Sequence, residues 1–283
     1  MIMARSASTS DTENPPLPTP LTDAPRLVAS DIDGTLLVTG QLPAVSVIEA
    51  VAAVRDAGHH FALATGRSLS GALTAARELG LTDGWLVASN GAVTARLAGG
   101  SYTVLETRDV DAEAAIRLAT RIRPDMRIAV EIVGIGYHVS EHFPVRALNG
   151  DQVKVGRLSD LWVGPTPRVV VYGQDAQRLV PALRAAGLTA IATRVDWVDI
   201  TVGSVSKATA VERLRRDLNI PAERTVSIGD AENDIELLQW AWRGVAMGHA
   251  TAQVQDAADE VTGTVGEDGA AAVLDALRSA AMP

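Results

Sequence analysis

Two carboxylates follow an apolar segment near the start of this 283-residue chain. The apolar residues 27–29 lead to Asp31 and Asp33, and Gly34 and Thr35 come directly after them. Two like charges about 4 Å apart repel by about 4 kcal/mol at an effective dielectric constant near 20. A hairpin turn would need only Asp33 and Gly34. The extra carboxylate at Asp31 is tolerable if a cation lies between the two, which is the arrangement that nucleophilic and acid–base chemistry on an anionic substrate requires.

Three other polar groups lie at the ends of predicted strands or at the start of a predicted helix. Thr65, Gly66 and Arg67 follow residues 60–64, Lys207 opens a predicted helix, and residues 229–234 follow a predicted strand. Taken singly, each has an ordinary interpretation as a turn, a helix cap or a solvated charge. Strand ends of a parallel α/β sheet meet at one edge, where ligands bind. We therefore expect the four groups to lie together.

The elements that would position these groups alternate between strand and helix. Short apolar strands and amphipathic helices of this kind predict a parallel sheet covered by helices. The predicted strands are 27–30, 60–64, 85–88, 225–228 and 245–247, and the predicted helices are 43–57, 68–79, 207–218, 233–241 and 270–280.

The middle of the chain has a different pattern. Adjacent strands without a helix between them predict an antiparallel sheet with helices on one face. The predicted strands are 127–133, 137–140, 168–172, 189–194 and 197–202, the predicted helices are 112–121 and 176–186, and residues 141–164 have no clear pattern. The fold class expected is thus α/β: a Rossmann-like core at residues 25–93 and 202–283, interrupted by an inserted α+β domain at residues 94–201.

Composition excludes several classes of protein. The net charge of −9 disfavours nucleic acid and anionic membranes as partners, and the lack of cysteine excludes disulfides and thiolate chemistry. No apolar run approaches the ~18 residues of a membrane span. Residues 1–24 lack a signal peptide's apolar region, and their Ser, Thr and Pro content predicts a disordered tail. We expect a cytoplasmic monomer or homodimer.

The polar groups together resemble a known family. D-x-D-G-T-L, a later T-G-R, a lysine opening a helix, and G-D-x-x-N-D occur in the order typical of the haloacid dehalogenase (HAD) superfamily of phosphohydrolases. The insertion between the second and third motifs, and Asn90 ahead of it, resemble the Cof-like class IIB branch with a C2-type cap. The resemblance covers nearly the whole chain from residue 26.

This resemblance implies a role for each motif. Asp31 would be the nucleophile and would form an aspartyl-phosphate, and Asp33 would be the general acid and then the base. Thr65 and Lys207 would complete the catalytic set. Mg²⁺ would be the cofactor, and the implied metal group is Asp31, Asp33 through its main-chain carbonyl, Asp230 and Asp234, the last from a second shell. Substrate binding would involve Gly34, Gly66, Arg67, Asn90 and Asn233.

The activity implied is Mg²⁺-dependent hydrolysis of a small phosphorylated metabolite, with sugar phosphates as the commonest class. A phosphotransferase or phosphomutase on the same scaffold and a catalytically silent phosphate-binding module are the alternatives. The inserted domain would set specificity, and its candidate residues are Glu141, His142, Arg146 and Lys154.

One segment matches a zinc motif. His138 and His142 fit the H-x-x-E-H pattern of inverted zinc proteases, which requires a helix so that both histidines share a face. The segment leaves a strand pattern and meets Pro144, which disfavours a helix. We therefore expect no zinc site at this position.

Overall fold

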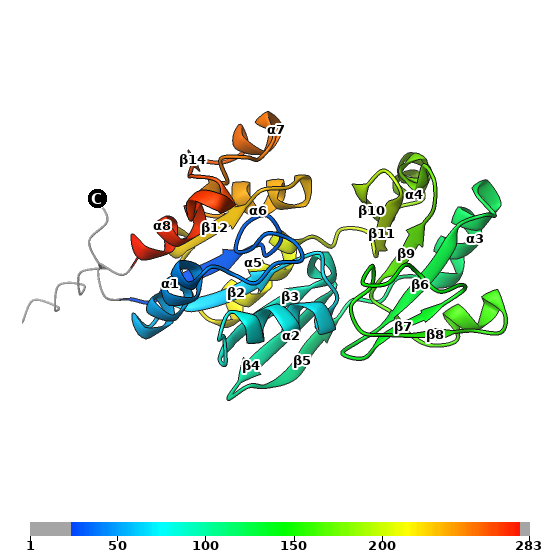
Figure 1. Ribbon diagram of the computed structural model, residues 1–283, viewed down its shortest axis with the longest axis horizontal. Coiled ribbons are helices and arrows are strands. Elements are labelled where there is room, and N and C mark those ends of the chain that lie inside the picture. Colours follow the sequence, from blue (N-terminus) through cyan, green and yellow to red (C-terminus); the bar gives the residue numbers. More distant parts are fainter. Residues whose placement is uncertain (1–23, 278–283) are drawn as a thin grey trace, which may run out of the picture.

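The computed structural model describes residues 24–277, and Figure 1 shows two sheets side by side. The first sheet has eight strands in the order β14-β13-β12-β1-β2-β3-β4-β5, and those from β14 to β3 run parallel. Its strands are β1 (Leu27–Ser30), β2 (His60–Ala64), β3 (Gly84–Ala88), β4 (Val93–Ala98), β5 (Ser101–Thr107), β12 (Thr225–Gly229), β13 (Arg243–Ala246) and β14 (Glu260–Val261).

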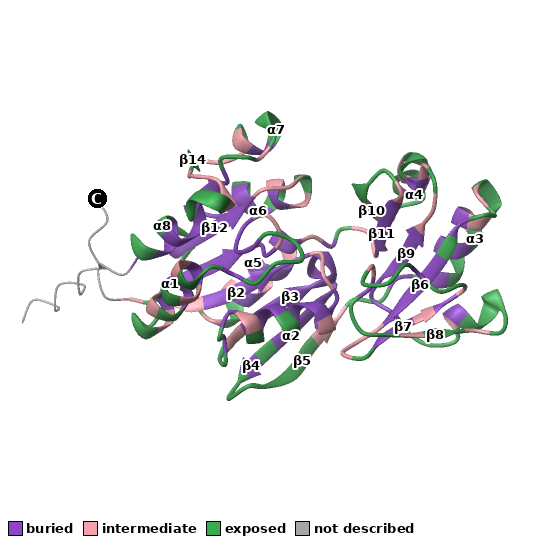
Figure 2. Cartoon of the chain, in the orientation of Figure 1, coloured by how far each residue is buried: buried purple, intermediate pink, exposed green. Residues whose placement is uncertain are grey.

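Helices cover both faces of this sheet because its central strands are apolar on both sides. Val28 of β1 packs in a cluster with α1, α2 and α8, whereas its neighbours Leu27 and Ala29 pack against α5 and α6 on the opposite face. In Figure 2 the central strands of this sheet are buried, whereas the edge strand β5 and the outer helix surfaces are exposed. The helices are α1 (Val45–Asp56), α2 (Leu69–Glu78), α5 (Lys207–Asp217), α6 (Ile235–Trp240), α7 (Ala252–Gln255) and α8 (Gly269–Asp275).

The second sheet has six strands in the order β10-β11-β9-β6-β7-β8 and is antiparallel except for the pair β7 and β8. Its elements are α3 (Ala112–Ile122), β6 (Arg127–Ile132), β7 (Gly136–Val139), β8 (Asp151–Lys154), β9 (Val169–Tyr172), α4 (Val180–Ala185), β10 (Thr189–Arg194) and β11 (Trp197–Thr201). α3 and α4 pack on one face. Phe143 and Leu148, from the β7–β8 connection, pack on the other face.

The expected two-part architecture is confirmed, but the predicted start of the insertion at residue 94 is wrong. β4 and β5 form a hairpin that extends the first sheet from β3, so the segment that carries the second sheet begins after Thr107. Gly99 and Gly100 have φ of +56° and +77° and make the two-residue turn of this hairpin. The sequence analysis ended the first sheet where the strand–helix alternation stops, and a hairpin at a sheet edge breaks that alternation.

Smaller differences concern short elements. β8 lies in the stretch without a clear pattern, and β14 was not predicted. The predicted helices at 176–186 and 233–241 each begin with a 3₁₀ turn, at Ala176–Leu179 and Glu232–Asp234. Further 3₁₀ turns are Ser89–Gly91, Leu158–Trp162, Ala222–Arg224 and Val265–Glu267. The predicted tail, apart from residue 24, and residues 278–280 of the predicted last helix lie outside the described residues. Among residues 24–277, no helix has the length and apolar character needed to cross a bilayer.

Candidate active site

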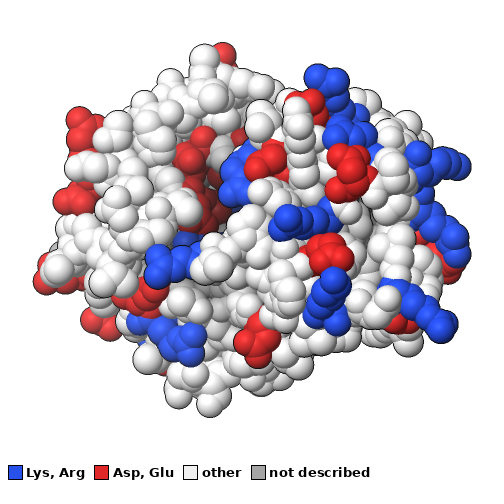
Figure 3. Space-filling model, turned by 45° about the vertical axis from the view of Figure 1, so that its right-hand side comes forward, with Lys and Arg blue, Asp and Glu red and all other residues white. Residues whose placement is uncertain are grey.

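The carboxyl ends of the central strands bring the predicted residues together. β1 pairs in parallel with both β2 and β12, so the residues that follow these three strands meet at one sheet edge. They are Asp31, Thr65 and Asp230. Figure 3 shows that this face of the molecule is hollowed and that Asp and Glu side chains gather in the hollow.

Lys207 is the buried cation of this site. Its side chain is 1% exposed, and its Nζ donates hydrogen bonds of 2.6 Å to Oδ1 of Asp31 and 2.6 Å to Oδ1 of Asp234. It is the first residue of α5, which Ser206 caps by accepting a hydrogen bond from the backbone N–H of Thr209. A cation is disfavoured at a helix N-terminus, because the helix dipole is positive there. The two carboxylates explain its position.

The charges of Lys207 and of the carboxylates around it shift one another's pKa values. Burial raises the pKa of the Asp31 carboxyl well above its usual range, and Asp234 and Asp230 add to this effect, whereas Lys207 opposes it. Burial alone would lower the pKa of Lys207, but the charges of Asp234 and Asp31 outweigh burial and raise it. Lys207 is therefore held in its charged form. Its single positive charge does not balance the three carboxylates of Asp31, Asp230 and Asp234.

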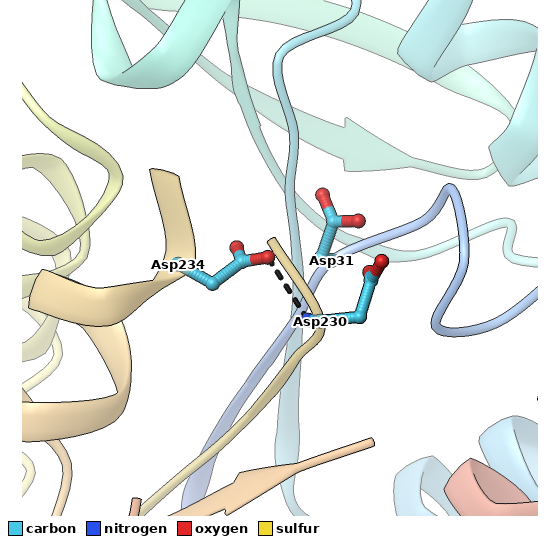
Figure 4. A group of neighbouring side chains, drawn as sticks. All are labelled: Asp31, Asp230 and Asp234. Carbon is cyan, nitrogen blue, oxygen red and sulfur yellow. Dashed lines mark hydrogen bonds between the residues drawn. The ribbon is translucent and has the colours of Figure 1, made fainter. Parts of the chain in front are cut away.

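Three carboxylates surround a space that suits a divalent cation. One oxygen from each of Asp31, Asp230 and Asp234 lies within 4.8 Å of the others, and Figure 4 shows the three side chains around this space. Asp230 also accepts a 2.8 Å hydrogen bond from Thr35 Oγ1, and burial raises the pKa of its carboxyl. Hard oxygen ligands of this kind fit Mg²⁺. The residues present therefore fit the expected cofactor.

Asp234 differs from the other two because both of its oxygens accept hydrogen bonds. Oδ1 accepts from Lys207, while Oδ2 accepts from the backbone N–H groups of Asp230 and Ala231 at 3.1 and 3.0 Å, the first of which is the dashed line in Figure 4. It thus fixes the Asp230 loop and the lysine at the same time. This arrangement favours a supporting role for Asp234 behind the metal ligands.

Asp33 is held by Arg67 instead of pointing freely into the site. Nε and Nη2 of Arg67 donate to the two carboxylate oxygens at 2.6 and 2.7 Å, and Thr39 Oγ1 donates at 2.9 Å. Burial raises the pKa of the Asp33 carboxyl, but the hydrogen bonds and charge of Arg67 outweigh burial, so the pKa lies below its ordinary value. The family resemblance implied that Arg67 binds substrate; in this structure the side chain of Arg67 is bonded to Asp33.

Amide and hydroxyl groups from the loops after β2, β3 and β12 lie close together. Asn233 Nδ2 donates to Asn90 Oδ1 at 2.9 Å, and an added Cβ on Gly66 would lie 3.2 Å from that same oxygen. The Asn90 side chain is buried, yet its Nδ2 has no partner among the described residues. Buried polar groups are normally paired, so this donor is available to an anionic oxygen such as that of a phosphoryl group. Thr65 is buried beside these groups and accepts from the backbone N–H of Arg67.

Three of the four candidate specificity residues of the inserted segment show contacts within that segment. Lys154 pairs with Glu141 at 2.8 Å on the surface, and His142 accepts through its carbonyl from Arg127. Arg184 of α4, which the sequence analysis missed, instead reaches the first sheet's side, 3.8 Å from the carboxylate of Glu232. One arginine among 23 gave no signal in the sequence. His138 lies on β7, so the expected absence of a helix at the zinc motif is confirmed.

Comparisons with known proteins identify the family of this chain. A model of the haloacid dehalogenase-like hydrolase family matches residues 28–140 and 174–274. The 5-amino-6-(5-phospho-D-ribitylamino)uracil phosphatase YitU of Bacillus subtilis is 26% identical over 263 residues, covering 88% of this chain and 96% of its own. A phosphoglycolate phosphatase of Natronomonas pharaonis is 29% identical over 251 residues, covering 89% and 97%.

Solved structures show the same architecture. BT1666, a HAD-superfamily phosphatase of Bacteroides thetaiotaomicron, superposes with a TM-score of 0.75 at 25% identity, over 95% of this chain and 99% of its own. The subclass IIB sugar phosphatase BT4131 superposes with a TM-score of 0.73 at 22% identity, over 89% and 98%. The chain belongs to the haloacid dehalogenase-like hydrolase family and is a phosphatase of that family.

Proposed function

We propose that this phosphatase hydrolyses the phosphate monoesters of small metabolites, sugar phosphates above all, with Mg²⁺ and through an aspartyl-phosphate on Asp31. The observation that carries the proposal is the position of Asp31: it is 5% exposed, 2.6 Å from the buried ammonium of Lys207, and beside the carboxylate of Asp230. A carboxylate in that position is a nucleophile held in place by a fixed cation.

The proposed hydrolysis has two steps, formation of the aspartyl-phosphate and its hydrolysis. In the first, an oxygen of Asp31 forms a bond to phosphorus, the bond from phosphorus to the leaving oxygen breaks, and Asp33 gives its proton to the leaving alcohol. In the second, Asp33 takes a proton from water, the water oxygen bonds to phosphorus, and the bond to Asp31 breaks. The pair with Arg67 favours ionised Asp33, the form that the second step needs, so the first step requires that this pair open.

A bound Mg²⁺ would neutralise charge on the nucleophile and on the phosphoryl oxygens. Asp31, Asp230 and the main-chain carbonyl of Asp33 would hold it, with Asp234 supporting Asp230 and Lys207 from behind. Thr65, Lys207, Asn233 and the unpaired Nδ2 of Asn90 would bind the phosphoryl oxygens.

Two observations support the proposed substrate class: the activities of the relatives and the position of Arg184. The relatives named above act on a ribityl phosphate and on phosphoglycolate, and one fold neighbour is a sugar phosphatase. Arg184 lies 3.8 Å from Glu232, next to Asn233 in the chain. Its Nε donates to the Ala190 carbonyl, its Nη groups can donate to sugar hydroxyls, and its side chain is 53% exposed. These facts support a small hydroxylated phosphate ester as the substrate.

The direct test is phosphate release from p-nitrophenyl phosphate and a panel of sugar and polyol phosphates. We expect release with Mg²⁺ and a fall to below about 1% of that rate with excess EDTA, because the uncompensated carboxylates then repel the substrate. Added Mg²⁺ should restore the rate. Full activity in EDTA would contradict the metal assignment. Transfer to a sugar acceptor without net release would indicate a phosphotransferase, and no turnover of any ester would indicate a silent module.

A glycine beside Asp230 gives a sharper test of the site geometry. Gly34 has φ of +83°, and an added Cβ would lie 2.3 Å from Asp230 Oδ2. We expect Gly34→Ala to lower kcat/KM by about 10²-fold, because a shift of about 1 Å in a metal-binding carboxylate misplaces the reacting groups. Gly40→Ala is the matched control: its φ is also +83°, but an added Cβ meets nothing within 4 Å. Equal losses of activity in both variants would show that backbone strain, not the contact with Asp230, is responsible.

A further inference from the structure

A second cluster of buried charges lies where the two sheets meet. Glu131 at the end of β6, Arg168 before β9 and Asp199 on β11 have side chains that are at most 4% exposed. Nε of Arg168 lies 3.1 Å from Oε2 of Glu131, and Nη1 lies 3.4 Å from Oδ1 of Asp199. Nη2 of Arg168 donates to the hydroxyl of Tyr137. The guanidinium of Arg168 thus forms ion pairs with two buried carboxylates.

This cluster also contacts the first sheet's loops. Oε2 of Glu131 accepts a 2.6 Å hydrogen bond from Ser89 Oγ, and Oε1 accepts from the backbone N–H of Leu69 at 3.2 Å. Nη1 of Arg168 donates to the carbonyl of Gly66 at 2.5 Å. Glu131 and Arg168 are therefore bonded to two segments of the proposed phosphate site, the Ser89 turn and residues 66–69.

The contacted turn is in an unfavourable conformation. Ser89, Asn90 and Gly91 have φ of +50°, +55° and +98° in succession, a region that residues with a Cβ rarely occupy. Such a turn persists only where its surroundings hold it. Its backbone is bonded to the neighbouring loop, because Ser89 N donates to Arg67 O at 2.8 Å and Asn90 N donates to Thr65 O at 3.0 Å.

We infer that Glu131 and Arg168 are positioning residues for the phosphate site. From the second sheet they hold the turn that carries Asn90 and the loop that carries Thr65, and so fix the groups that receive the phosphoryl oxygens. A displacement of about 1 Å in such groups costs up to about 10²-fold in rate. The inserted domain thereby acts on the phosphate site itself. This inference rests on the proposed binding of phosphate at Thr65 and Asn90.

Two variants weaken the same contact from opposite sides. Ser89→Ala removes the donor in the first sheet, and Glu131→Gln keeps the shape of the acceptor but removes its charge and one of its two acceptor oxygens. We expect each to lower kcat/KM for p-nitrophenyl phosphate by at least about tenfold and to weaken binding of inorganic phosphate, measured by calorimetry with Mg²⁺, by a similar factor. The double variant should lose little more than either single one, because both act on one contact.

Asp199→Asn is the matched control. Asp199 is as buried as Glu131 and also faces Arg168, but its hydrogen bonds, to Arg168 and Trp197, lie within the second sheet. We expect this variant to stay within about threefold of wild type in kcat/KM and in phosphate affinity, even where its thermal midpoint falls as far as that of Glu131→Gln.

The outcomes separate this inference from the proposed function. Phosphate affinity within threefold of wild type in Ser89→Ala would overturn the positioning role, as would an equal loss in Asp199→Asn. If Glu131→Gln does not fold, Ser89→Ala alone decides. A wild-type protein that binds phosphate but releases none from any ester would contradict the proposed function, and the variants' phosphate affinities would still test the positioning role.

Discussion

Asp31→Asn is expected to lower kcat by about 10⁴-fold or more, equivalent to about 5 kcal/mol of lost transition-state stabilisation. The amide is nearly the same size as the carboxylate but cannot attack phosphorus. The fold should persist, because Lys207 keeps its 2.6 Å partner Asp234 and the two remain a neutral pair in the core. Steady-state kinetics with p-nitrophenyl phosphate and a thermal melt measure the two effects.

The matched control is Asp230→Asn, which changes a neighbouring carboxylate that would bind the metal without attacking phosphorus. This variant should lose activity that high Mg²⁺ partly restores, because its defect is in metal affinity. Asp31→Asn should not respond to added Mg²⁺. Retention of more than about 1% of the wild-type kcat by Asp31→Asn, a loss below ~2.7 kcal/mol, would argue against covalent catalysis at this residue.

Lys207→Arg is expected to lower kcat/KM by at least about 10²-fold, or ~2.7 kcal/mol, although the formal charge is unchanged. The ammonium of Lys207 is 1% exposed and lies 2.6 Å from two carboxylates, so the site is closed around a compact cation. A planar guanidinium is wider and would displace Asp31 or the phosphoryl group. Overpacking of this kind also costs about 1–3 kcal/mol of stability, which a lower thermal midpoint would report.

Lys154→Arg is the control, because Lys154 is the other lysine of the chain. It pairs with Glu141 on the surface, where the two side chains are 46% and 61% exposed, and exposed pairs contribute little. We expect kcat/KM within about twofold of wild type. A Lys207→Arg variant that also stays within about threefold would show that any positive charge suffices at position 207.

Much of the site could be predicted because its residues follow strands. Asp31, Thr65 and Asp230 come directly after β1, β2 and β12, and the ends of parallel strands meet at one edge. Lys207 stands out for a different reason, because it is one of only two lysines in the chain. Local sequence therefore predicted the strand ends and the helix start that carry these groups, and the general rule for parallel sheets placed them together.

Contacts between distant segments could not be predicted in this way. The pair Asp33–Arg67 depends on which of several acceptors a long side chain reaches, and Glu131 and Arg168 look like ordinary charges on strands. Only tertiary packing buries them against the Ser89 turn. The β4–β5 hairpin was not predicted for a similar reason, because its pairing with β3 has no local signal beyond its glycine turn.

The most direct measurement for the central claim is detection of the phosphorylated enzyme. Trypsin cleaves after Arg26 and Arg55, so the peptide 27–55 contains both Asp31 and Asp33 and has no internal cleavage site. Asp33→Asn should slow hydrolysis of the intermediate, so this variant is acid-quenched during turnover with substrate and Mg²⁺ and digested for mass spectrometry. We expect one phosphoryl group on this peptide, at Asp31 and removable by hydroxylamine, and none in the variant that also carries Asp31→Asn. Turnover with no phosphate on this peptide, or phosphate at another residue, would contradict the account.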